Sequence, residues 1–161
     1  MNYTAFLEGY ETDDKGRTID NILHWSNIRL EISHNYIQRV FPTDESSKHD
    51  RIFEPATRDD ILSISLNEKA KDNIRKMYLK MLLLWKLDGE NYKTIKMYRY
   101  WNQENNHNHL RMTRILKCFR LIEMNDELKD FSNRLIFLLE HNGLKISKKT
   151  EELWRANFYY G

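Results

Sequence analysis

A predicted helix that begins at His107 carries a stripe of side chains able to bind an anion. The stripe follows the spacing i, i+4, i+7, i+11 and consists of His107, Arg111, Arg114 and Cys118. Ile115 flanks it, which places Arg111 at the edge of an apolar face rather than in water. A partly buried guanidinium needs a carboxylate, a phosphate or several neutral acceptors, because leaving it unpaired is costly.

A second predicted helix, residues 27–41, carries a polar stripe beside its apolar face. With Leu30 at the centre of that face, an arc roughly 40° to 140° away holds an acid, an imidazole and three amides. These side chains are Asn27, Glu31, His34, Asn35 and Gln38. A solvent-facing arc is more often rich in Lys and Glu, so this composition indicates that the side chains contact other parts of the protein or a ligand.

Three interpretations of the two stripes stay open. In the favoured one, Glu31 pairs with Arg111 or Arg114, because buried charges are usually satisfied internally. His34 and Gln38 would then complete a structural network. In the second, the arginines bind a phosphate or carboxylate of a ligand that the histidines and amides orient. In the third, one of the histidines acts as a general base, although neither has a nucleophile or metal partner recognisable in the sequence.

Two other patterns are less specific. His107-Asn108-His109 spells the name of a nuclease motif, but that site needs a ββα-metal context. Histidines two residues apart lie about 200° apart on a helix and cannot share a metal. Between Tyr92 and Trp101, three basic residues alternate with four aromatic ones, which could hold phosphates and stack bases. The same pattern is more often amphipathic packing.

Composition limits the elements that could position these residues. The chain has 161 residues, 40% of them hydrophobic, which suits one domain with one core. Five Gly and two Pro are too few for the turns of an all-β fold and favour helices.

Charge, cysteine content and hydropathy limit the partners and the compartment. The formal net charge of +2 excludes an overall electrostatic footprint for nucleic acid. One cysteine forms no internal disulfide and suggests a reducing compartment. No secretory signal and no membrane span is recognisable, so we expect a cytoplasmic protein, or a nuclear one in a eukaryote.

Hydrophobic spacing and capping signals predict an all-α fold, a compact irregular bundle of six to seven helices. Residues 1–15 are mixed and acidic, and we interpret them as a peripheral arm. The expected helices are a short one after Thr18, then 27–41, one after Thr57, then 68–87, 107–123, 127–142, and a last one after Ser147. The 68–87 helix is apolar on so many sides that we expect it at the centre.

Three segments resemble signature segments of the opioid growth factor receptor N-terminal domain family. They are GRTIDNILHWSN (16–27), LEISHNYIQRVFP (30–42) and HNHLRMTRILKCFRLI (107–122). The resemblance implies a compact all-α fold, an intracellular location and a single-domain member without the long repeat-bearing tail of vertebrate relatives. The enkephalin-binding role of those relatives does not transfer to a bare domain. Arg39 stands where family members commonly have Trp, so a binding surface lined by that Trp would be altered here.

We therefore expect residues 1–161 to form one domain that acts as a non-enzymatic binding module for a peptide, a protein or a small anion. The expected binding residues are Glu31, His34, Gln38, His107, Arg111 and Arg114. One alternative is nucleic-acid binding through residues 92–101, and another is an enzyme acting on a phosphorylated or carboxylated small molecule. The sequence indicates no catalytic residue, no cofactor, no metal and no membrane partner, and it leaves the oligomeric state open.

Overall fold

A computed structural model describes residues 1–47, 50–90 and 95–161. These residues form an all-α structure, and the part of the chain described contains no strand. Its helices are α1 (Tyr3–Glu8), α2 (Ile19–Leu23), α3 (Asn27–Ile32), α4 (Ile37–Val40), α5 (Arg58–Ser65), α6 (Glu68–Trp85), α7 (His107–Leu121), α8 (Asn125–Leu139) and α9 (Lys148–Asn157). None of the described helices is both long and apolar enough to cross a membrane.

Side-chain caps set the start of several helices at the positions that the sequence predicts. Thr18 and Thr57 each accept a hydrogen bond from the backbone three residues later, and each forms a full capping box. Ser147 caps α9 by accepting a hydrogen bond from the backbone N–H of Thr150. The predicted starts of α2, α5 and α9 are therefore confirmed.

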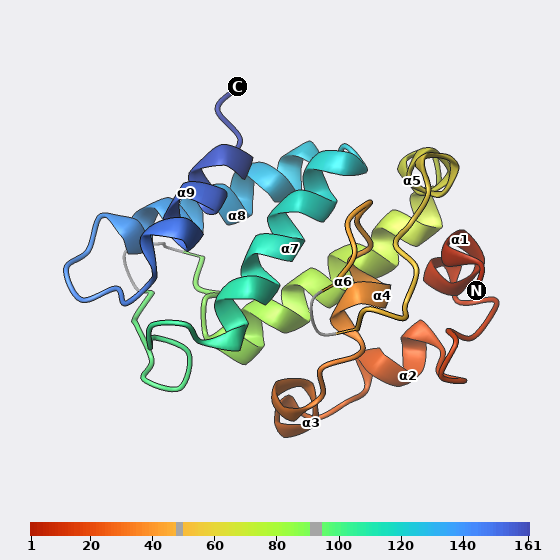
Figure 1. Cartoon of the computed structure of the whole chain (residues 1–161), viewed down its shortest axis with the longest axis horizontal. Helices are drawn as coiled ribbons and strands as arrows, with labels where there is room; N and C mark the ends of the chain where they lie inside the picture. Colours follow the sequence, from red (N-terminus) through yellow and green to blue (C-terminus); the bar gives the residue numbers. More distant parts are fainter. Residues whose placement is uncertain (48–49, 91–94) are drawn as a thin grey trace.

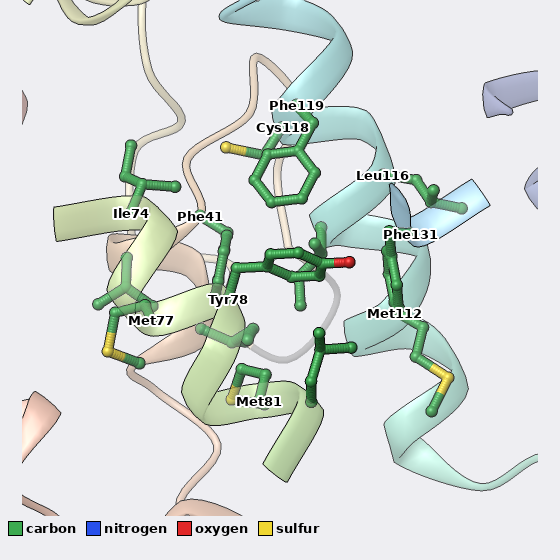
Figure 2. Packing of buried hydrophobic residues seen from close by; sticks show 14 of the residues in the cluster. Phe41, Ile74, Met77, Tyr78, Met81, Met112, Leu116, Cys118, Phe119 and Phe131 are labelled. Carbon is green, nitrogen blue, oxygen red and sulfur yellow. The ribbon is translucent and has the colours of Figure 1, made fainter. Parts of the chain in front are cut away.

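Helix α6 lies at the centre of the molecule, as its apolar pattern predicts. It packs against α1, α2, α3 and α5, and α7–α9 lie on its other side (Figure 1). Tyr78 of α6 makes edge contacts with Phe119 of α7 and Phe131 of α8, at ring-centroid distances of 5.1 and 5.4 Å. Figure 2 shows Tyr78 among these rings and the side chain of Met81. One aromatic cluster thus joins the three longest helices.

The N-terminal residues do not form the peripheral arm expected over residues 1–15. Residues 3–8 form α1, which packs against α5 and α6. Phe6 and Leu7 are fully buried, and Tyr3 is nearly so. The expectation is wrong for this part of the chain because three apolar side chains in a short helix find a complementary surface on α6.

The predicted helix 27–41 is two short helices instead of one. Helix α3 ends at Ile32, Ser33 is extended, and α4 begins at Ile37. Tyr36 donates its hydroxyl hydrogen to the carbonyl oxygen of Leu30, so a side chain satisfies a group at the end of α3. This break and the presence of α1 raise the count from the expected six to seven helices to nine among the described residues.

Candidate functional site

Five of the six predicted binding residues line one cavity. The cavity has a volume of about 330 Å³ and lies between α7, α9 and the segment from residue 34 to residue 47. Its lining includes the predicted residues His34, Gln38, His107, Arg111 and Arg114. The sixth, Glu31, lies beside the first turn of α7, where it contacts His107 and Asn108.

Glu31 pairs mainly with His107 and Asn108. Its Oε1 lies 2.9 Å from Nε2 of His107, although this nitrogen is not aligned for a hydrogen bond. The side-chain amide of Asn108 donates to both carboxylate oxygens, at 3.1 and 3.2 Å. The side-chain oxygen Oδ1 of Asn108 accepts from the indole N–H of Trp85 at 3.0 Å, which ties Glu31 to the core. Asn108 is fully buried, and it was not among the predicted binding residues.

Arg111 binds main-chain carbonyl oxygens at the end of α3. Its Nη1 donates to the carbonyl of Leu30 at 3.0 Å, and its Nη2 donates to those of Glu31 and Ser33 at 3.2 and 2.6 Å. The nearest carboxylate oxygen of Glu31 is 3.9 Å away. A cation at a helix C-terminus interacts favourably with the carbonyls that have no partner within the helix. Arg111 is thus almost fully satisfied within the protein.

Arg114 has a different environment from Arg111. Its Nη1 donates to the Phe41 carbonyl and to the Thr43 hydroxyl, both at 3.2 Å. Nε and Nη2 have no hydrogen-bond partner among the described residues, and the residue lines the cavity. No carboxylate of the described residues lies within 4 Å, and burial lowers the pKa of the guanidinium. Arg114 therefore brings a cation to the cavity without a paired anion.

His34 and Gln38 form the opposite wall of the cavity. The ring of His34 lies edge-on to that of His107, with a centroid distance of 5.4 Å. The amide nitrogen of Gln38 donates to the His34 carbonyl at 2.9 Å and to the Ser47 hydroxyl at 3.3 Å. Because a carbonyl only accepts, the first bond fixes the orientation of the amide. The buried amide oxygen has no partner among the described residues.

Two lysines at the cavity were not among the predicted residues. Lys117 pairs with Glu45 at 2.8 Å, and Lys149 reaches the cavity from the first turn of α9. Lys117 follows Arg114 by three residues on α7, so helical spacing could have identified it. No local signal places α9 beside α7, and Lys149 could not have been found that way.

The geometry gives no support to a nuclease motif at His107-Asn108-His109. His109 is buried, lies away from the cavity lining, and its Nε2 is 2.6 Å from the carbonyl oxygen of Trp101. Burial lowers the pKa of His109, which keeps its imidazole neutral. The described residues include no group of three or more His, Cys, Asp or Glu side chains that could hold a metal ion.

The basic aromatic segment 92–101 is only partly described. Residues 92–94 lie outside the described residues. Trp101 is fully buried and donates its indole hydrogen to the carbonyl oxygen of Trp85 at 3.0 Å. Its ring is therefore part of the core and does not present a face on which a base could stack.

Arg39, where the resemblance noted above leads to an expectation of Trp, is fully buried. It forms ion pairs with Asp14 and Asp50 at 2.5 and 2.9 Å, and its guanidinium lies 3.8 Å from the ring centroid of Phe53. The residue joins the N-terminal segment to the loop before α5. Its charge is satisfied internally, in contrast to that of Arg114.

Comparison with known proteins identifies one family. The model of the opioid growth factor receptor (OGFr) conserved region matches residues 1–160. The search of curated proteins and the search of solved structures gave no match.

Proposed function

The chain belongs to the family of the opioid growth factor receptor conserved region, and from this premise we propose that it is a non-enzymatic binding module whose cavity holds the anionic group of a ligand against Arg114. The observation that carries the proposal is that Arg114 lines the cavity while its Nε and Nη2 have no hydrogen-bond partner among the described residues. A guanidinium edge with two N–H groups binds a carboxylate or phosphate through two parallel hydrogen bonds. Such a pair would supply the counter-charge that Arg114 lacks within the protein.

The surrounding charges favour an anion in the same place. Lys149 adds a second cation at the mouth, and Glu45, which brings the one carboxylate among the described lining residues, already pairs with Lys117. An anion that enters the cavity therefore meets two cations without close acidic partners. Glu31 lies outside the lining and is engaged by His107 and Asn108.

A binding role accounts for the site better than a catalytic one. The imidazole of His107 faces a carboxylate and a second imidazole, and neither is a group that it would activate as a nucleophile. Cys118 is fully buried, and burial raises the pKa of its thiol to about 12, which keeps it protonated. The guanidinium of Arg114 is held in place by hydrogen bonds to Phe41 and Thr43, which is the preorganisation that a binding site needs.

Nuclear magnetic resonance of Arg side chains tests the proposal directly. We expect titration with acetate or inorganic phosphate to move the Nε–H resonance of Arg114 in a saturable manner. When binding is followed by the backbone amide resonances of the lining residues, Arg114→Met should lower the affinity at least tenfold, because a paired charge and two hydrogen bonds are lost. Arg120→Met is the matched control, since Arg120 is an exposed arginine of the same helix with the same charge. Equal losses in the two variants, or no shift at Arg114, would overturn the proposal.

A further inference from the structure

The cavity combines its cations with an apolar wall. Ile37 of α4, Leu110 of α7 and Leu153 of α9 line it. Leu110 is 47% exposed, which is high for a leucine in the lining of a cavity. When a ligand covers apolar surface that was in contact with water, the free energy of the complex falls.

On each of two helices, a leucine and a cation that line the cavity lie four residues apart. On α7, Leu110 precedes Arg114 by four residues, and on α9, Lys149 precedes Leu153 by four residues. Side chains four residues apart are neighbours on one face of a helix. On each helix, one of the cations that line the cavity therefore has a leucine directly beside it.

The volume and the number of available charges limit the ligand further. About 330 Å³ lies near the lower end of the range of roughly 300–1,000 Å³ for small-molecule sites. Arg111 is engaged by three backbone carbonyls and Lys117 by Glu45, which leaves Arg114 as the one deeply placed cation of the described lining with open donors. A single anionic group matches this arrangement, whereas a polyanion would leave charges unpaired.

We infer that the ligand is a small amphiphile with one anionic group, a carboxylate or a monoester phosphate, on Arg114 and a hydrocarbon body along Leu110 and Leu153. The inference rests on the proposed function and adds the chemical class of the ligand to it. The apolar body supplies affinity by covering the leucines, and the anion fixes the orientation by pairing with the guanidinium.

A chain-length series tests the apolar half of the site. We expect the dissociation constants of acetate, butyrate, hexanoate and octanoate to fall about fourfold for each added methylene until the cavity is filled. Leu110→Asn should flatten this dependence, since it removes apolar surface without burying a new group. The control is Leu79→Asn, because Leu79 is a 53% exposed leucine of α6 outside the cavity. Its series should match that of the unchanged protein.

The possible results distinguish the amphiphilic ligand from the anion site at Arg114. Binding of acetate and octanoate with equal affinity, abolished by Arg114→Met, would overturn the amphiphilic ligand and leave the anion site standing. A dependence on chain length that Leu110→Asn leaves unchanged would also overturn it. If no member of the series binds at Arg114, both the proposed function and this inference fail. A parallel series of alkyl phosphates identifies the preferred head group, and equal slopes in the two series would confirm the shared apolar contact.

Discussion

Arg111 and Glu31 contact each other more closely through the main chain than through their charges. The Nη2 of Arg111 donates to the Glu31 carbonyl oxygen at 3.2 Å, whereas its Nη1 lies 3.9 Å from the Glu31 carboxylate. The structural network expected from the sequence therefore exists in a different form. Arg111 holds the end of α3, and the carboxylate is held by the first turn of α7.

Arg111→Met should lower the free energy of unfolding by about 3 kcal/mol, because buried carbonyl oxygens lose their donors. Glu31→Gln should lower it by less than about 1 kcal/mol, since a half-exposed ion pair contributes little. Urea unfolding followed by circular dichroism measures both values. Equal losses would show that the side-chain charges, rather than the carbonyl contacts, stabilise this junction.

Arg114→Met should change the free energy of unfolding by less than about 1 kcal/mol. The loss of two hydrogen bonds to Phe41 and Thr43 is offset by removal of a partly buried, unpaired charge. The same urea experiment compares it with Arg111→Met. A loss as large as that of Arg111→Met would mean that Arg114 serves the fold and not a ligand.

The ion pair between Arg39 and Asp14 should make stability depend on acid pH. Hydrogen bonds from Arg39 lower the pKa of Asp14 below its ordinary value of 3.8. A carboxyl whose folded pKa is depressed contributes stability above its unfolded pKa, and this contribution is lost as pH falls through the folded pKa. We expect the free energy of unfolding to fall below about pH 4, and to fall less steeply in Asp14→Asn. Identical slopes in the two proteins would contradict the assignment.

At neutral pH, Arg39→Met should be strongly destabilising. The change leaves the carboxylates of Asp14 and Asp50 without their common partner. Loss of one partner of a buried ion pair costs about 3–5 kcal/mol, and we expect the lower end because both carboxylates reach water. The free energy of unfolding at pH 7 measures this effect. Arg29→Met is a suitable control, since Arg29 is an exposed arginine of α3.

Cys118 should not react with thiol reagents while the protein is folded. The side chain is fully buried, and burial raises the pKa of the thiol to about 12, so almost no thiolate forms at pH 8. Labelling with iodoacetamide, followed by mass spectrometry, should proceed only at the rate of unfolding and rise with added urea. Rapid labelling in native buffer would contradict this burial.

Local signals in the sequence identified most of the helical segments and where several of them begin. The caps at Thr18, Thr57 and Ser147 involve atoms within three residues of each other, so no distant part of the chain is needed to form them. The apolar stripe of α6 likewise indicates burial on several sides. The stripe of His107, Arg111 and Arg114 depends on one helix alone, and the structure contains that helix.

Tertiary contacts decided what the stripe faces. The break between α3 and α4 forms where Tyr36 and Arg111 satisfy carbonyl oxygens, and Arg111 is about eighty positions away along the chain. The docking of α9 brings Lys149 and Leu153 to the cavity through packing that no local pattern encodes. Two arginines of similar sequence context thus differ in role. Arg111 binds carbonyl oxygens at the end of α3, whereas Arg114 lines the cavity. The two environments differ because residues far apart in the sequence come together only in the folded chain.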